Sequence, residues 1–355
     1  MKIAIILNSL LPAGTNIATK DFVDELIKSH NCKVDVYTLK AFSKGDLIFE
    51  NVKKLNFFSV IPFNKYDVIY SCTLKSDLYV FLTKKFFIRN RKVKFVSTIH
   101  NVIEEDLFYD YGLLISKIFS RFWLFLKFNN DELVVSSESM MKYYQRFINK
   151  NKMTLIEYGR SEKSLTNFQV QNNDRKHILK LKEKYKIVGT IGVFSKRKNY
   201  ALVTELLVKY KDLCWVSLGS GEEEENIKHI VKSEGLENRV LFLGNRPDSR
   251  PYYIFFDVFF HPSRSEGFAL VLIDAMSNKT PILLARLAIY QSILKDDMVS
   301  YFDLDNNDSL FEAFDRIMRD RCFTEMCIEK AYEIYLKRFS ISVYGQKYFN
   351  IFKFQ

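Results

Sequence analysis

The chain has 355 residues, of which 48% are hydrophobic and 27% charged, and its 53 Lys and Arg against 42 Asp and Glu give a formal net charge of +11 at pH 7. This composition excludes a disordered or fibrous chain, and the length suffices for two domains. No run of about 18 uncharged apolar residues occurs, so no transmembrane helix is expected.

The charge distribution indicates the kind of partner, and the cysteines indicate the redox environment. Residues 51–100 alone contain ten basic and two acidic residues. Such an excess predicts an anionic partner: lipid head groups, a nucleic acid or a phosphorylated acceptor. The five cysteines show no spacing typical of a zinc site, so we expect reduced thiols in a cytosolic protein.

Each half of the chain begins with a strand, a loop and a helix. In the first half the apolar run 2–9 leads into an amphipathic helix at 17–30, which favours a buried strand over a signal peptide. In the second half the run 185–194 leads into a helix at 200–210. Further runs of strand length lie at 33–39, 67–72, 93–100, 132–137, 214–221, 239–244, 257–263 and 280–285. Strands alternating with helices predict an α/β protein with parallel, doubly wound sheets.

The polar stretch 158–180 has no periodicity and is typical of a linker. We therefore expect an N-terminal domain at 1–165 and a second domain at 166–335. Residues 336–355 are predicted to be helical. In doubly wound sheets, ligands bind beyond the carboxyl ends of the strands. The residues at predicted strand ends are His100, Gly219, Gly244, His261 and the loop 195–199.

The stretch HPSRSEGFALVLIDAM, residues 261–276, is the strongest candidate for a site. Glu266 and Asp274 are carboxylates eight positions apart, and Gly267 follows the first. If a helix begins near Phe268, the free N–H groups of its first turn form an anion site. Carboxylates beside such a site suit a ligand with hydroxyl groups and a phosphate, as in a nucleotide-sugar. The same residues also describe an ordinary helix start with a buried stripe, and the spacing alone leaves both interpretations open.

The longer stretch PSRSEGFALVLIDAMSNKTPIL resembles the pattern PSxxEGFGLVxLEAMAxGxPVV of the retaining glycosyltransferases with the GT-B fold, the family called glycosyl transferases group 1. The matching positions are Pro262, Ser263, Glu266, Gly267, Phe268, Ala275, Met276 and Pro281. Two positions depart from the pattern: Asp274 replaces a Glu, and Lys279 replaces a frequent Gly.

The resemblance implies two Rossmann-like domains facing across a cleft, with the final helix packing back on the first domain. It implies an NDP-sugar as donor substrate, no further cofactor and no metal. Glu266 would bind sugar hydroxyls, and Asp274 would hold the ribose. The N–H groups of Phe268, Ala269 and Leu270, next to Gly267, would stabilise the diphosphate together with Lys198.

The loop GVFSKRKN, residues 192–199, resembles the family's GRLxxxKG, in which an Arg and a Lys hold the diphosphate. Lys198 matches the Lys, whereas Val193 stands at the Arg position. Lys196 or Arg197 could supply the missing charge. A solvated basic turn is the alternative interpretation.

Three further positions follow from the resemblance. His100, at the end of VKFVSTIH, is similar to the family's TxHD histidine, which implies a role in positioning and charge near the reacting carbon. Gly14 in the loop PAGTN would let the backbone approach the donor phosphate. Near Gly244, backbone groups would bind the base.

The pattern Asp303-Leu304-Asp305 has the D-x-D spacing of metal-dependent glycosyltransferases, but its polar surroundings favour a turn. Two segments suggest contact with an anionic membrane surface. Residues 84–94 interleave six basic residues with Phe86, Phe87 and Ile88, and residues 113–128 form an apolar helix with a narrow polar stripe. For 113–128, a core helix of the first domain is the favoured alternative.

We therefore expect a retaining glycosyltransferase that moves a sugar to a saccharide or lipid-linked saccharide in surface polysaccharide synthesis. Its expected location is the cytoplasm, at the inner face of the cell membrane. The alternatives are a GT-B sugar-nucleotide epimerase and a degenerate module that binds a nucleotide-sugar without catalysis. Charge alone suggests a nucleic-acid binder, but no recognised motif accompanies it, so no nucleic acid is expected.

Overall fold

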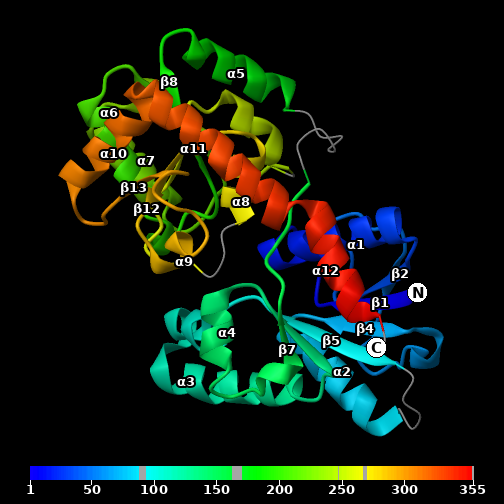
Figure 1. Cartoon of the computed structure of the whole chain (residues 1–355). Coiled ribbons are helices and arrows are strands. Elements are labelled where there is room, and N and C mark those ends of the chain that lie inside the picture. The colour runs from blue at the N-terminus through cyan, green and yellow to red at the C-terminus, as the bar shows by residue number, and fades with distance from the viewer. Residues whose placement is uncertain (88–92, 162–169, 247, 267–269, 354–355) are drawn as a thin grey trace. The chain divides into compact units, whose positions relative to one another are not determined.

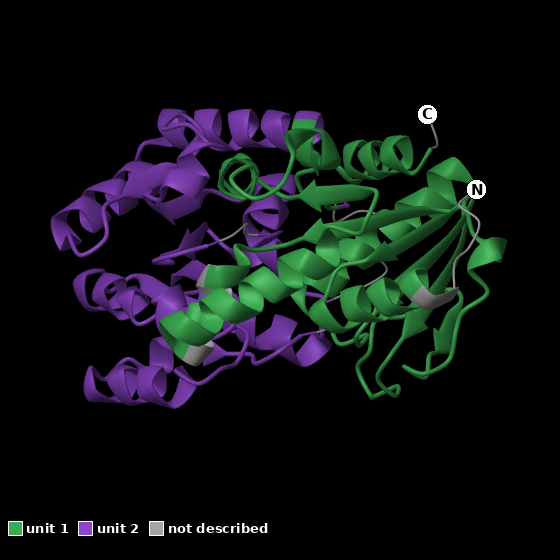
Figure 2. Ribbon diagram, turned by 90° about the horizontal axis from the view of Figure 1, so that it is seen from below, with its two compact units in different colours: residues 1–160, 338–355 green, residues 161–337 purple. Residues whose placement is uncertain are grey.

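The structure is a computed structural model that describes residues 1–87, 93–161, 170–246, 248–266 and 270–353 (Figure 1). The chain forms two compact units, residues 1–160 with 338–355 and residues 161–337 (Figure 2). The chain thus changes unit after 160 and after 337, where the sequence predicted boundaries after 165 and 335.

The first unit is built on a seven-stranded parallel sheet in the order β3-β2-β1-β4-β5-β6-β7. The strands are β1 (Lys2–Leu7), β2 (Lys33–Thr38), β3 (Val52–Lys54), β4 (Val68–Ser71), β5 (Lys94–Ile99), β6 (Glu132–Val135) and β7 (Met153–Leu155). The chain adds strands to one side of β1 and then, from β4, to the other. This reversal makes the carboxyl ends of β1 and β4 a topological switch point, where ligands of doubly wound sheets bind.

The helices of the first unit are α1 (Gly14–His30), α2 (Leu74–Phe87), α3 (Ile103–Lys127), α4 (Glu138–Tyr144) and α12 (Ile341–Phe352). Helix α12 packs on α1, since the rings of Phe22 and Tyr348 stack with centroids 4.1 Å apart. Gly345 makes the approach possible, because a Cβ atom there would lie 2.4 Å from Cγ of Glu25. The last helix is therefore an integral part of the first unit's core.

The second unit contains a six-stranded parallel sheet in the order β10-β9-β8-β11-β12-β13. Its strands are β8 (Lys186–Ile191), β9 (Leu213–Leu218), β10 (Val240–Phe242), β11 (Val258–His261), β12 (Ile282–Ala285) and β13 (Ser300–Phe302). Its helices are α5 (Asn172–Lys182), α6 (Leu202–Lys209), α7 (Glu224–Ser233), α8 (Leu270–Ser277), α9 (Ala288–Gln291), α10 (Asn307–Arg319) and α11 (Arg321–Ile334). The order reverses between β8 and β11, so a second switch point lies at their carboxyl ends.

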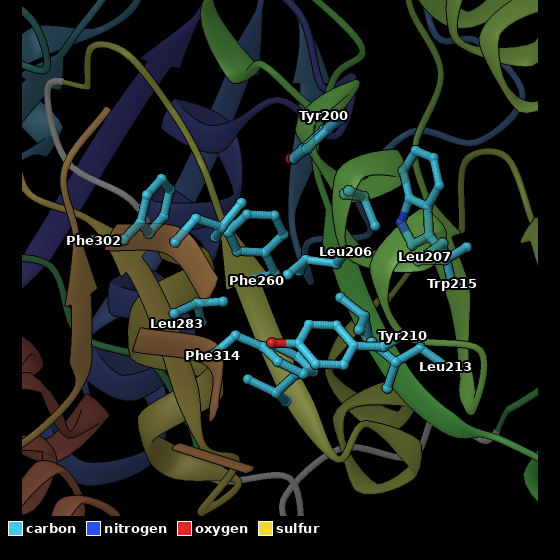
Figure 3. Packing of buried hydrophobic residues seen from close by; sticks show 14 of the residues in the cluster. Tyr200, Leu206, Leu207, Tyr210, Leu213, Trp215, Phe260, Leu283, Phe302 and Phe314 are labelled. Atoms are coloured by element: carbon cyan, nitrogen blue, oxygen red, sulfur yellow. The ribbon is translucent and has the colours of Figure 1, made fainter. Parts of the chain in front are cut away.

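Large side chains from strands and helices fill the core of the second unit (Figure 3). Trp215 and Phe260 project from the sheet, Leu206 from α6 and Phe314 from α10, and all are buried. The indole N–H of Trp215 donates to Oγ1 of Thr190 at 2.8 Å, so its polar atom is satisfied inside the core. This packing gives the loops after β8 and β11 a rigid base.

None of the helices in the described part of the chain combines the length and apolar composition that crossing a bilayer requires.

Candidate functional site

Two loops meet at the switch point of the second unit. The loop after β8 contains a 3-10 turn, η4 (Lys196–Lys198), and the loop after β11 leads toward α8. The backbone N–H of Arg264 donates to the carbonyl of Arg197 at 2.8 Å. In return, the Arg197 guanidinium donates to the carbonyl of Ser265 at 2.6 Å. These bonds fix the two loops side by side and bring the basic turn to Glu266.

Glu266 is the centre of a buried charged cluster. Its side chain is only 6% exposed, and Oε1 lies 2.5 Å from Nζ of Lys198 and 3.5 Å from Nε2 of His261. Oε2 lies 3.0 Å from Nη1 of Arg197. Burial raises the pKa of Glu266, but the hydrogen bond from His261 and the charges of Lys198 and Arg197 outweigh it and hold the pKa well below its ordinary value. Glu266 is therefore ionised at neutral pH.

His261 completes this cluster and is fully buried at the end of β11. Burial, followed by the charge of Lys198, lowers the pKa of His261 despite the opposing effect of Glu266. Its imidazole is thus neutral at pH 7. Nε2 also lies 3.2 Å from Oγ of Ser263, whereas Nδ1 has no hydrogen-bond partner among the described residues. The sequence places His261 at a predicted strand end, but no pattern assigns it to the site.

The cluster has an excess of positive charge. Burial lowers the pKa of Lys198 below its ordinary value, and the nearby Glu266 carboxylate offsets this effect only in part. With Lys198 and Arg197 charged and His261 neutral, two cations face the one carboxylate of Glu266. Lys196, on the same turn, is exposed and adds a further cation. A site with this balance favours an anionic ligand.

Glycines bring the neighbouring loops together. A Cβ atom on Gly219, which follows β9, would lie 1.9 Å from the carbonyl oxygen of Gly192, which follows β8. Gly244 has a φ of 69° with open space around its Cα, and its carbonyl accepts from the N–H of Gly219 at 2.9 Å. Val193, at the expected Arg position, is 61% exposed.

Helix α8 begins at Leu270, in agreement with a helix after Glu266. Gly267, Phe268 and Ala269 lie outside the described residues. Of the backbone N–H groups predicted to bind the anion, the structure therefore describes only that of Leu270. Asp274 lies in the middle of α8 with a buried side chain.

Two predicted site residues belong to the first unit: Gly14, at the start of α1, and His100, directly after β5. Gly14 is the first residue of α1, so the helix begins three residues before the predicted position 17, and PAGTN is only partly a loop. His100 follows β5 and is buried, with Nδ1 2.5 Å from the Tyr158 hydroxyl and Nε2 without a partner among the described residues. Burial, and then the charge of Lys127, lowers the pKa of His100 to about 3. At neutral pH the imidazole therefore offers hydrogen bonds rather than charge, and a role of His100 near the reacting carbon stays a prediction.

Behind His100 lies a buried ion pair that the sequence analysis missed. Nζ of Lys127, at the end of α3, lies 2.9 Å from Oδ2 of Asp77 in α2, and both side chains are 0% exposed. Lys127 also donates to Oγ of Ser97, and the Trp123 indole donates to Asp77, each at 2.7 Å. No periodic signal reveals such a pair, since a charged residue in a helix normally lies on the exposed face.

The two segments suspected of membrane contact differ in the structure. Residues 88–92 of the segment 84–94 lie outside the described residues. Residues 113–127 of the second segment lie in α3, and the favoured interpretation of 113–128 as a core helix is wrong. Most of its large apolar side chains are exposed: Leu113, Leu114, Ile115, Ile118, Phe119, Phe122, Phe125 and Phe128.

The D-x-D pattern is engaged in ion pairs with two different arginines. Asp303 contacts Arg286 at 3.2 Å, and Asp305 contacts Arg264 at 2.5 Å. Among the residues that the structure describes, no group of three or more His, Cys, Asp or Glu side chains is arranged to hold a metal ion.

The chain is similar to known proteins along its length. The family Glycosyl transferases group 1 matches residues 171–334. The O-antigen biosynthesis glycosyltransferase WclY of Escherichia coli is 28% identical over 99% of this chain and 98% of its own. The sucrose-phosphate synthase of Thermosynechococcus elongatus has a TM-score of 0.78 at 19% identity, covering 99% of this chain and 98% of its own. HepE of Anabaena, in complex with UDP and glucose, has a TM-score of 0.77 at 16% identity, covering 99% of both chains. These similarities confirm the predicted α/β class with two doubly wound sheets, the GT-B fold.

Proposed function

We propose that this chain moves a sugar, with retention of configuration, from an NDP-sugar to a saccharide or lipid-linked saccharide. Residues 171–334 match the family glycosyl transferases group 1, and the glycosyltransferase WclY resembles the chain along its whole length. The acceptor would belong to a surface polysaccharide, as the name of the relative WclY suggests. HepE was solved with UDP and glucose, so UDP-sugars are the first donors to test.

The observation that carries this proposal is the cluster of Glu266 with Lys198, Arg197 and His261 at a switch point. A diphosphate would supply the negative charge that the cluster lacks. Glu266 retains free lone pairs, because a carboxylate accepts about four hydrogen bonds. It can therefore accept bonds from sugar hydroxyls while the cations hold the phosphates.

The proposed catalysis is mainly electrostatic. Negative charge grows on the diphosphate as the glycosidic bond breaks, and the largely buried Lys198 and the partly exposed Arg197 would stabilise it. His261 holds the carboxylate of Glu266 in place. Asp274 would bind the nucleotide ribose, and neutral His100 would donate or accept a hydrogen bond at the transferred sugar. No metal enters this scheme.

The remaining roles concern the periphery of the site. Gly14 and Gly244 would bind donor phosphate and base through their backbones, and Lys196 would attract the donor. We propose that the protein works in the cytoplasm, at the inner face of the cell membrane, where it would meet a lipid-linked acceptor and an anionic surface. Retention of configuration is proposed from the family resemblance.

The test is a screen of the full chain against UDP-, GDP-, ADP- and CMP-sugars, scoring nucleotide release with and without a bacterial lipid extract. Release of one nucleotide, stimulated by the extract, is expected, and the product's anomeric proton coupling should match that of the donor. Isomerised donor without any acceptor would instead identify an epimerase. Tight nucleotide binding without release or transfer would identify a non-catalytic module.

Glu266→Gln tests the site itself. It keeps the shape but removes the charge, and we expect a loss of transfer of about 100-fold or more. Glu329→Gln is the matched control, because Glu329 pairs with Lys279 at 2.9 Å on the exposed surface. Equal activity of the Glu266→Gln protein and the control would refute the assignment of the site.

A further inference from the structure

Between Leu113 and Phe122, helix α3 has polar side chains on its buried face and large apolar ones on its exposed face, whereas Leu124 and Leu126 further along are buried. From Leu113 onward, its buried face includes Ser116 and Ser120, whose hydroxyls donate to backbone carbonyls of the same helix at 2.9 and 3.0 Å. Its outer face carries Leu and Ile, with Leu114 75% and Ile118 62% exposed. A water-exposed helix normally shows the opposite arrangement. An apolar face of this size marks an interaction surface.

The exposed side chains form a continuous stripe. Leu114, Ile118, Phe122 and Phe125 follow one another at spacings of four, four and three residues, which places them along one side of a helix. Gly112, with a φ of 74° and a ψ of 175°, breaks the helix just before the stripe begins. The stripe is therefore presented by one uninterrupted helical segment, Leu113–Lys127.

Basic residues lie within this face. Lys117 and Arg121 are exposed on the same segment, and residues 112–130 contain no acidic residue. The Arg121 guanidinium lies 4.3 Å from the centroid of the Phe147 ring, which keeps its charge at the surface. An occupant of this face must therefore offer an apolar phase and negative groups side by side.

We propose that the face of α3 formed by residues 113–125 inserts into the interfacial region of an anionic lipid bilayer. Acyl chains take up the apolar side chains, and lipid phosphates contact Lys117 and Arg121. A second copy of this chain would offer the same apolar and cationic groups, so its charges would repel. This inference deepens the proposed function, because it identifies the surface that would bring the enzyme to a lipid-linked acceptor.

The experiment measures binding of the full chain to vesicles of phosphatidylglycerol and phosphatidylethanolamine, and to vesicles of phosphatidylcholine alone. We expect tighter binding to the anionic vesicles, weakened by salt. Ile118→Ser with Phe122→Ser should weaken binding by about a hundredfold, because two large apolar side chains no longer enter the bilayer. Lys117→Gln with Arg121→Gln should weaken binding to the anionic vesicles alone, by about thirtyfold.

Matched controls lie on the second unit. Leu179→Ser with Val208→Ser removes two exposed apolar side chains elsewhere, and Lys176→Gln with Lys180→Gln removes two exposed charges. Both control proteins should bind vesicles like the unaltered protein. Vesicle binding that survives in the Ile118→Ser, Phe122→Ser protein would overturn the proposal, as would no binding by the unaltered protein. A dimer that this variant converts to a monomer would overturn it too, in favour of a second copy.

Nucleotide release separates this inference from the proposed function. All four variants should hydrolyse or transfer the donor at unaltered rates in detergent solution, where no bilayer is needed. Vesicle binding without any donor activity would contradict the proposed function and leave the surface intact. Donor activity without vesicle binding would contradict the proposed membrane surface and leave the proposed function intact.

Discussion

Nζ of Lys198 lies 2.5 Å from Oε1 of Glu266, although the two residues are 68 positions apart in the chain. The pair joins the loops that follow β8 and β11, and both side chains are almost completely buried. Because a buried charge needs a partner, Lys198 must remain paired when the donor binds. A diphosphate oxygen would be a second acceptor for the same ammonium group.

Lys198→Ala should reduce kcat/KM for the donor by about 10²–10³-fold, the effect of losing one group that stabilises charge in the transition state. Lys198→Arg should restore part of it, because it retains the charge with a different geometry. Steady-state nucleotide release measures both. The control is Lys196→Ala on the same turn. Since Lys196 is exposed, its loss should change kcat/KM by less than about fivefold. If Lys196→Ala reduced kcat/KM more than Lys198→Ala does, the assignment of Lys198 as the group that stabilises the diphosphate would be contradicted.

Val193→Arg should increase affinity for the donor nucleotide. The Val193 side chain is 61% exposed, so a longer side chain fits without displacing the core. It stands where the family pattern has an arginine, and an added charge near a diphosphate contributes about 1 kcal/mol, or roughly fivefold in Kd. Isothermal titration with UDP and GDP tests this. Val208→Arg, a change at an exposed position of α6, is the control. Equal affinities of the two variants would show that the diphosphate binds elsewhere.

The sequence predicted the sheets better in their centres than at their edges. Every predicted strand is present, but β3, β7 and β13 were missed. Each has three residues and lies at the edge of its sheet. A run this short cannot show a period of two, and an edge strand is less completely apolar than a central one. The central strands β1 and β8 show long apolar runs because both of their faces are covered.

The sequence predicted individual residues of the site but not how they are arranged. Glu266 and Lys198 were identified separately by pattern, whereas the role of His261 depends on a contact that spacing cannot reveal. The face of α3 was misjudged for a related reason. Periodicity identifies which residues share a side of a helix, but not which side is buried. Only the structure shows that Ser116 and Ser120 lie on the buried side while most of the large apolar side chains are exposed.

His100 should make stability depend on pH. Its folded-state pKa of about 3 lies below the ordinary value of about 6.5, so between these values only the unfolded chain binds the proton. The contribution of neutral His100 to stability is therefore complete above about pH 6.5. Below that pH it falls, and the unfolding equilibrium constant rises by about tenfold per pH unit.

His100→Gln removes this dependence. The free energy of unfolding, measured with urea between about pH 5 and pH 7, should depend less steeply on pH in this variant, by about one proton. His229→Gln, at an exposed position, is the control. Identical slopes for both variants would refute a neutral, buried His100.

Lys127→Met should destabilise the protein strongly, by about 3–5 kcal/mol, because it leaves the Asp77 carboxylate buried without its counter-charge. The carboxylate would keep its bonds from Trp123 and Ser97, but these dipoles do not neutralise it. Adding Asp77→Asn removes the unpaired buried charge, so the double variant should be more stable than Lys127→Met alone.

Urea unfolding followed by circular dichroism measures the three proteins. Lys330→Met, which breaks an exposed pair with Asp297, should cost less than about 1 kcal/mol. If Lys127→Met cost no more than this control, the ion pair would be a minor contact. A double variant less stable than the single one would show that the bonds to Asp77, rather than its charge, dominate this part of the core.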